Sequence, residues 1–253
     1  MQAKLSILFL TTFAIGGQAQ SFGCGTKEPS AEHMDMSKRL AGLERDKTAS
    51  GFSGLDDDIK VPTYFHVVAA SDKVADGYLT EKMLSDQLAV MNSDFAPYQV
   101  SFDLIETTRT INTSWSEWGD ATAMKLALRK GDYGSLNVYF MNSMFGALGL
   151  CFFPTNITTE PEALPLDGCG IVSSTVPGGD NTDYNLGKTA VHEIGHWLGL
   201  YHTFQDGCDS DGDFVDDTPA QASFSEGCPI GRDSCPDHPG IDPIHNYMDY
   251  SVE

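Results

Sequence analysis

The chain has 253 residues, with 36 acidic side chains and only 15 lysines and arginines, which gives a formal net charge of −21 at pH 7. This length suits one hydrophobic core, so we expect one folded domain after N-terminal processing. A polyanion would be repelled by such a chain, which argues against nucleic acid as a partner, whereas cationic peptides would be attracted.

The N-terminus has the pattern of an export signal. Lys4 precedes an apolar run at residues 5–15, and small residues follow as far as Ala19. The run is too short to span a bilayer, and no later segment approaches twenty apolar residues. We therefore expect residues 1–19 to be a signal peptide, and the mature protein to be secreted, extracellular, free of membrane attachment and monomeric.

Residues 20–60 are charged, rich in Gly and Ser, and weakly periodic, which indicates a pro-segment or an N-terminal arm. The single cysteine of this segment, Cys24, has two interpretations that stay open. Its thiolate fills a metal site in a latent precursor, or it forms a structural disulfide.

The next part of the chain alternates strand and helix patterns. β-Branched and aromatic runs predict strands, in one of which His66 is expected to be a core residue. Apolar residues at helical spacing, with Thr80 near the start, predict a long amphipathic helix. The predicted elements are a strand at 61–70, a helix at 79–95, a strand at 100–105 extending to about 110, a helix at 120–130, and strands at 136–144 and 171–176.

Two cysteines and two glycosylation motifs lie in this region. Cys151 and Cys169 flank a Pro-rich loop, and we expect them to close it as a disulfide, because an oxidising compartment favours pairing. Asn112 and Asn156 each begin an Asn-x-Ser/Thr tripeptide, which makes them candidates for glycosylation.

A helix is predicted from about residue 189, and it contains the most informative pattern in the chain. On a helix, His192 and His196 lie four residues apart on one face, so their imidazoles can bind one ion. Gly199 can end the helix in a left-handed conformation and bring His202 to the same ion. Three imidazoles and one water make an open zinc site, and Glu193 is placed to act as general base on the zinc-bound water.

After His202 the chain loses periodicity and is rich in Asp, Gly, Pro and Ser, so we predict a loop-rich lobe held by disulfides. The acidic run at 206–217 is a candidate calcium site, because clustered carboxylates suit hard cations. It does not have EF-hand spacing, and solvated loop acids are the alternative.

The pattern His192-Glu193-x-x-His196-x-x-Gly199-x-x-His202, followed by residues 246–250 (Asn-Tyr-Met-Asp-Tyr), resembles the metzincin metallopeptidases. The segments 184–189, 202–204, 217–219, 228–233 and 242–245 bring the chain closest to the pappalysins, in particular to small secreted fungal and microbial members. The resemblance covers residue 60 to the end. It implies an α+β fold whose upper lobe has a twisted mixed sheet and two long helices, above a loop-rich lower lobe stapled by disulfides.

The resemblance also implies roles for single residues. His192, His196 and His202 would bind one zinc ion, and Glu193 would be the general base. Met248 would form the turn beneath the metal, and Tyr250 would help to stabilise the oxyanion during attack on a protein or peptide substrate. Relatives also imply a Cys208–Cys235 disulfide, which leaves Cys228 free or paired with Cys24.

One departure from these relatives concerns the C-terminus. They continue into a further helix, whereas this sequence stops three residues after Tyr250, so reduced stability or an incomplete record is expected. We expect residues 61–253 to form the catalytic domain of a secreted zinc endopeptidase. The alternative is a catalytically silent secreted homologue that binds zinc or traps substrate.

Overall fold

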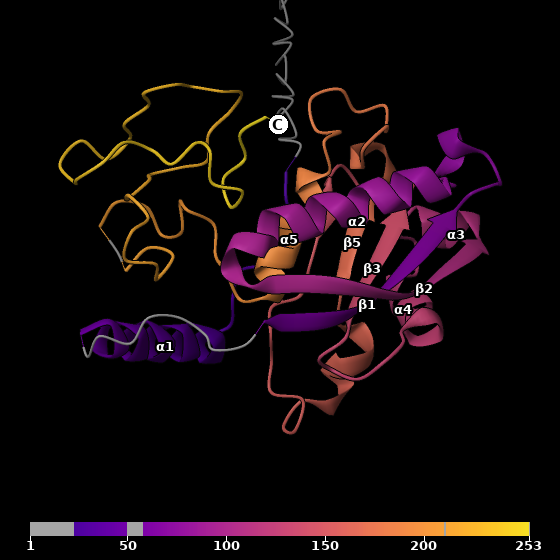
Figure 1. Ribbon diagram of the computed structural model, residues 1–253, viewed down its shortest axis with the longest axis horizontal. Helices are drawn as coiled ribbons and strands as arrows, with labels where there is room; N and C mark the ends of the chain where they lie inside the picture. The colour runs from indigo at the N-terminus through magenta and orange to yellow at the C-terminus, as the bar shows by residue number, and fades with distance from the viewer. Residues whose placement is uncertain (1–22, 50–57, 210, 253) are drawn as a thin grey trace, which may run out of the picture.

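The computed structural model describes residues 23–49, 58–209 and 211–252 (Figure 1). The predicted signal peptide at 1–19 lies outside these residues. No helix in the described part of the chain is long and apolar enough to cross a membrane. The helices are α1 (Ala31–Ala49), α2 (Glu81–Phe95), α3 (Thr113–Ser116), α4 (Ala121–Leu128) and α5 (Lys188–Trp197); the strands are β1 (Ile59–Ala69), β2 (Val100–Ile111), β3 (Leu136–Met141), β4 (Gly149–Leu150) and β5 (Cys169–Val172).

The sheet has the order β2-β1-β3-β5-β4. Neighbouring strands from β2 to β5 run parallel, and β4 runs antiparallel to β5 at one edge. This is the mixed sheet that the family resemblance implied. The strand predicted at 171–176 is wrong in its second half, because Ser173–Thr175 form a 3-10 turn that leads away from the sheet.

Both faces of the sheet are covered, as parallel strands require. Phe65 and Val67 of β1 belong to a core that includes apolar side chains of α2 and α5. Val68 points to the opposite face, where it joins a second cluster with Tyr139 of β3 and Met124 of α4. Figure 1 shows α2 and α5 together on one side of the sheet and α3 and α4 near its other end. Successive side chains of β1 point to opposite faces and are buried on both, which separates the two layers.

Helix α2 holds the start of α5. The hydroxyl of Thr80 caps α2 by accepting a hydrogen bond from the Met83 amide at 3.2 Å, as its position near the predicted start suggested. Farther along α2, the buried Gln87 donates to the Gly187 carbonyl at 3.0 Å, directly before α5 begins. Gly187 has φ +87°, so the entry into α5 needs a residue without a Cβ.

The lower lobe contains no helix or strand within residues 203–209 and 211–252. Polar contacts hold it together. Asp249 accepts hydrogen bonds from the Ser225 amide at 2.9 Å and the Gln221 side chain at 3.0 Å. Arg232 pairs with the buried Asp242 at 2.7 Å, and Cys208 is bonded to Cys235. The predicted loop-rich, disulfide-stapled lobe is thus present.

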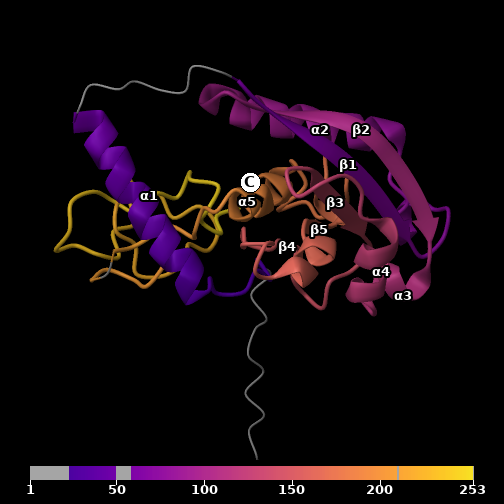
Figure 2. The same cartoon turned by 90° about the horizontal axis from the view of Figure 1, so that it is seen from below.

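The arm predicted at 20–60 contains helix α1, which periodicity did not indicate. Figures 1 and 2 both place α1 beside the C-terminal loops and away from the sheet. Lys38 pairs with Asp211 and Arg45 with Asp216, each at 2.8 Å, and Ser37 hydrogen-bonds the Tyr201 hydroxyl at 3.0 Å. Because α1 contacts its neighbours mainly through polar groups, an apolar stripe in its sequence is not needed.

His66 makes the sheet sensitive to acid. Its ring is buried between Thr108, at 2.7 Å from Nδ1, and Asn137, at 2.9 Å from Nε2, and burial lowers its pKa to about 4. In the unfolded chain the His66 imidazole binds a proton near pH 6.5, whereas in the folded protein it stays neutral until about pH 4. The folded state therefore loses stability as pH falls from 6.5 towards 4. We predict that, between pH 7 and pH 4, the free energy of unfolding falls by about 3 kcal/mol less in His66→Gln than in the wild type.

Denaturant unfolding of both proteins at the two pH values measures this difference. His238→Gln, in the lower lobe, controls for the loss of an imidazole elsewhere. Equal acid sensitivity of wild type and His66→Gln would contradict the prediction.

Candidate metal centre and active site

The helix α5 and the turn after it bring three imidazoles together. His192 and His196 are buried on one face of α5. The amide of Leu200 donates to the Gly195 carbonyl at 2.9 Å, and Gly199 has φ +97°, so the helix ends in a left-handed turn. The turn reverses the chain and returns His202 to His196, with 3.1 Å between their Nε2 atoms. The predicted helix end at Gly199 is confirmed.

Backbone carbonyls orient two of the imidazoles. Nδ1 of His192 lies 2.6 Å from the Tyr247 carbonyl, and Nδ1 of His196 lies 2.8 Å from the Leu200 carbonyl. A carbonyl only accepts, so both Nδ1 atoms carry the proton and both Nε2 atoms present a lone pair. Burial lowers the pKa of His192 to about 4 and that of His202 to about 3, which keeps these rings neutral at pH 7.

The three Nε2 atoms fit a tetrahedral metal. His196 Nε2 is 3.1 Å from His192 Nε2 and 3.1 Å from His202 Nε2. Two nitrogens bound to zinc at about 2.0–2.1 Å in tetrahedral geometry are about 3.3 Å apart. Neutral imidazole is also a preferred zinc ligand. The donor set therefore suits zinc in both spacing and chemistry.

Glu193 lies between these imidazoles and the N-terminal arm. Its side chain is 1% exposed, and burial raises its pKa to about 7. One carboxylate oxygen, Oε2, accepts hydrogen bonds from the Thr26 hydroxyl at 2.9 Å and from the Cys24 thiol at 3.4 Å. A carboxylate with such a pKa can take up and release a proton near neutral pH.

Cys24 is placed at the same centre. Its sulfur and one nitrogen from each of the three histidines lie within 4.8 Å of one another. Both Cys24 and Cys228 are free thiols in the structure, and Cys228 is exposed. The disulfide between them that the sequence left open does not form, nor does Cys24 pair with any other cysteine.

The arm is hydrogen-bonded to the sheet edge next to the centre. The amide of Gly25 donates to the Gly149 carbonyl at 2.8 Å, and the amide of Leu148 donates to the Gly23 carbonyl at 3.0 Å. A third hydrogen bond between the arm and this edge runs from the Cys151 amide to the Thr26 hydroxyl oxygen, at 2.9 Å. The segment 23–26 thus lies along β4 like an added strand. Sequence analysis did not identify Thr26 as a candidate site residue.

Met248 and Tyr250 lie beneath and beside the imidazoles. Met248 is 5% exposed, and its sulfur packs so tightly against α5 that a Cβ on Gly195 would overlap it. The Tyr250 hydroxyl is 3.2 Å from His202 Nε2, and burial raises its pKa. The phenol therefore stays protonated at neutral pH.

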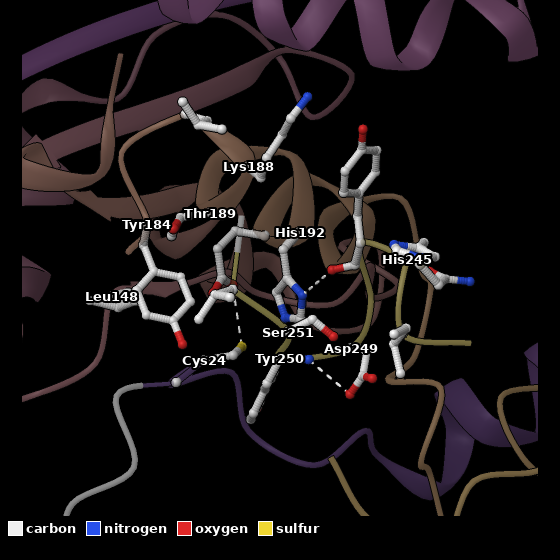
Figure 3. Close-up of a pocket in the computed structure, with 17 residues that line it drawn as sticks. Cys24, Leu148, Tyr184, Lys188, Thr189, His192, His245, Asp249, Tyr250 and Ser251 are labelled. Atoms are coloured by element: carbon white, nitrogen blue, oxygen red, sulfur yellow. Dashed lines mark hydrogen bonds between the residues drawn. The ribbon is translucent and has the colours of Figure 1, made fainter. Parts of the chain in front are cut away.

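A cavity of about 350 Å³ opens beside His192 and Glu193. Figure 3 shows the Cys24 sulfur, the His192 ring and Tyr250 on its border, with Lys188 and Asp249 at its edges. Leu148 and the segments 184–189 and 244–252 supply most of the remaining wall. Sequence analysis did not predict this cavity, since its wall comes from segments far apart in the chain.

The remaining candidate residues lie outside the centre. The structure forms the Cys151–Cys169 disulfide, which ties the loop after β4 to β5. Asn156 is exposed, whereas Asn112 is half-buried and caps α3 through its side-chain oxygen. In the acidic run at 206–217, Asp211 and Asp216 are paired with the lysine and arginine of α1 described above.

This combination of an α+β fold with a mixed sheet, a helix that carries two histidines and a third histidine after a glycine turn defines a metzincin-like metallopeptidase. Comparison with known proteins agrees with this class. The M43 peptidase family model, described as pregnancy-associated plasma protein-A, matches residues 130–253. The chain belongs to this family, the pappalysins.

Similar proteins include fungal and bacterial peptidases. An extracellular metalloprotease of Colletotrichum graminicola is 58% identical, over 96% of this chain and 87% of that protein. Extracellular metalloprotease 1 of Coccidioides posadasii is 52% identical, over 100% and 91%. The solved structure of mature mirolysin from Tannerella forsythia, in complex with a cleaved peptide, has a TM-score of 0.63 and 26% identity, and covers 79% of this chain and 86% of that one.

The contact between α5 and Met248 leads to a prediction about Gly195. Alanine is usually the better helix residue, but here its Cβ would overlap the buried Met248 sulfur. We predict that Gly195→Ala lowers the free energy of unfolding by about 1–3 kcal/mol, as overpacking does. Denaturant unfolding measures the change.

The matched control is Gly42→Ala in α1, where a Cβ would meet nothing within 4 Å. That variant is expected to be neutral or slightly stabilising. Equal effects of the two substitutions would show that Met248 does not restrict position 195.

Proposed function

We propose that this protein is a secreted, zinc-dependent endopeptidase in which Glu193 is the general base. The observation that carries the proposal is the convergence of three neutral imidazoles, with His196 Nε2 3.1 Å from Nε2 of both His192 and His202, beside a buried carboxylate. The signal-like N-terminus and relatives that are named extracellular metalloproteases support secretion.

His192, His196 and His202 would hold the metal. When bound, zinc supplies Lewis-acid chemistry: it makes a nearby water more acidic and withdraws electron density from the scissile carbonyl. The carbonyl contacts at Nδ1 of His192 and His196 keep both rings in the tautomer that leaves Nε2 available.

Glu193 then carries the proton through the reaction. With a pKa raised to about 7, its carboxylate accepts a proton from the attacking water and passes it to the leaving amine. The protonated Tyr250 hydroxyl, next to His202, donates a hydrogen bond to the carbonyl oxygen as negative charge develops there. Met248 supports the underside of α5 and positions the imidazoles without touching the substrate.

The arm would keep the full chain latent. Cys24 occupies the space at the three imidazoles that the attacking water needs, and Thr26 donates to the Glu193 oxygen that would take the water's proton. Hydrogen bonds along β4 hold both groups in place, and the ion pairs of α1 attach the arm to the lower lobe. Removal of the arm would free the water site and the general base together.

The first test replaces the general base. With the arm released from both proteins, Glu193→Ala is expected to lower casein-digesting activity at least about 100-fold relative to wild type, since general-base catalysis contributes this much or more. Metal analysis of the same protein should find one zinc per chain, because the three imidazoles are unchanged. A chelator should abolish wild-type activity.

Full activity of Glu193→Ala would remove the glutamate from the mechanism. Zinc without any wild-type activity, after release of the arm, would identify instead a silent binding homologue.

The second test concerns latency. Cys24→Ala and Thr26→Val should each raise the activity of the intact full chain about tenfold or more, since hydrogen bonds to a charged group contribute about 1.5–3 kcal/mol. Valine keeps the branched shape of threonine and lacks only the hydroxyl. Cleavage of a quenched fluorescent peptide, with mass spectrometry to confirm that the arm is still attached, gives the measurement.

Cys228→Ala removes the other free thiol, which is exposed, and serves as the control for Cys24→Ala. Thr26→Ser, which keeps the hydroxyl, controls for Thr26→Val. Full activity of the intact wild-type chain would contradict the latency proposal and leave the proposed peptidase function in place.

A further inference from the structure

The third imidazole of the centre is oriented differently from the other two. Nδ1 of His192 and Nδ1 of His196 each meet a backbone carbonyl. Within residues 23–49, 58–209 and 211–252, Nδ1 of His202 has no hydrogen-bond partner, and the ring makes its polar contacts through Nε2. A metal-binding histidine relies on an outer contact for its orientation. A contact of another kind therefore has to orient His202.

The ring of Phe204 lies flat against His202. The two ring centres are 4.8 Å apart, and the planes differ by only 7°. Stacking at this separation is favourable for aromatic pairs. The lone pair of Nε2 lies in the plane of the imidazole, so a neighbour that fixes this plane also limits the directions in which the lone pair can point.

The backbone on either side of Phe204 is anchored. The amide of Thr203 donates to the Met248 carbonyl at 3.3 Å, and the Thr203 side chain is buried. On the other side, the amide of Gln205 donates to the His202 carbonyl at 3.0 Å. The chain from His202 to Gln205 therefore forms a turn tied to Met248, and this turn keeps the Phe204 ring beside the imidazole.

Phe204 also contacts Tyr250. Their ring centres are 5.1 Å apart with planes at 76°, and the Tyr250 ring is itself edge-on to His202, at 5.1 Å and 83°. Phe224 packs against Tyr250 at 5.4 Å and against Phe204 at 6.0 Å. Among the described rings, Phe224 does not contact His202. Phe204 thus touches both the third imidazole and the phenol, whereas Phe224 touches the phenol alone of these two.

We propose that Phe204 is a positioning residue of the metal centre, which holds the His202 imidazole in the plane needed to bind zinc and keeps the Tyr250 phenol beside it. Stacking does for His202 what the Tyr247 and Leu200 carbonyls do for the other two imidazoles. A leucine at position 204 would have no flat face, so the imidazole plane would no longer be fixed. The inference rests on the proposed zinc-dependent function, because it requires His202 to be a metal ligand.

The first test measures zinc affinity by competition with a chelator. The full chain is used with its arm attached, so Cys24 is the same in every variant and no activity is needed. Phe204→Leu is expected to weaken zinc binding about tenfold, at the lower end of the effect of losing an outer contact of a metal ligand. Phe204→Tyr keeps the flat ring and should bind zinc as the wild type does.

Phe224→Leu is the matched control for this measurement. It removes a ring that contacts Tyr250 but not His202, and it should leave zinc affinity unchanged. Phe204→Met, with a flexible apolar side chain, gives the same comparison if Phe204→Leu does not fold. Unchanged zinc affinity in the Phe204 variant, or equal weakening in the Phe204 and Phe224 variants, would overturn the inference. A wild-type chain that binds no zinc would overturn the proposed function as well.

The second test measures kcat with zinc-saturated enzyme after release of the arm, which mass spectrometry confirms. Phe204→Leu is expected to lower kcat about tenfold when Tyr250 is present. In the Tyr250→Phe background it should cause no further loss, because the hydroxyl that it would misplace is already absent. Equal losses in both backgrounds would overturn the role of Phe204 in placing Tyr250. Absence of cleavage by the released wild-type enzyme would overturn the peptidase proposal, and the zinc measurement would still decide whether Phe204 orients His202.

Discussion

The site depends on the hydrogen bonds that two imidazoles make through Nδ1, on the side of the ring away from the metal position. The Tyr247 and Leu200 carbonyls each take an Nδ1 proton, so the lone pairs of His192 and His196 face inward together. Without these bonds each ring could turn, or could present a protonated nitrogen to its neighbour. The three Nε2 atoms would then no longer point their lone pairs at one metal position. One carbonyl comes from the helix end and the other from the turn at Met248. The metal centre is therefore built jointly by both lobes.

Polar contacts on the far side of α5 fix where the helix ends. Asp167 accepts the indole proton of Trp197 at 3.1 Å, and it is itself buried beside Arg129. Lys125, buried in the same region, donates to the Leu166 and Gly168 carbonyls at 2.8 and 2.9 Å, and burial lowers its pKa to about 7. Buried charges are tolerated only when paired in this way. Asp167, in the loop before β5, thus links the last residue of α5 to the basic side chains at the end of α4.

The same few groups serve two states of the proposed enzyme. In the full chain Glu193 accepts hydrogen bonds from Thr26 and Cys24. Once the arm is removed, it would accept the proton of the attacking water. The strand edge at β4 now pairs with residues 23–25, and its Gly149 has no side chain that would strike Glu193. A substrate backbone would use the same edge, because an unpaired strand offers its amides and carbonyls to any extended chain. In the proposed mechanism, the arm and a substrate would therefore compete for the same strand edge.

The sequence alone determined the features that depend on local spacing. Backbone geometry within a few residues accounts for the histidines four residues apart on α5, the left-handed turn at Gly199 and the Thr80 cap. β-Branched and aromatic runs indicated the strands. Tertiary structure decided the rest. The Thr26 contact with Glu193 joins residues 167 positions apart, and the ion pair of Lys188 with Asp94 joins α5 to α2. No local pattern encodes such contacts, since they arise only when the folded core brings distant segments to one edge of the sheet.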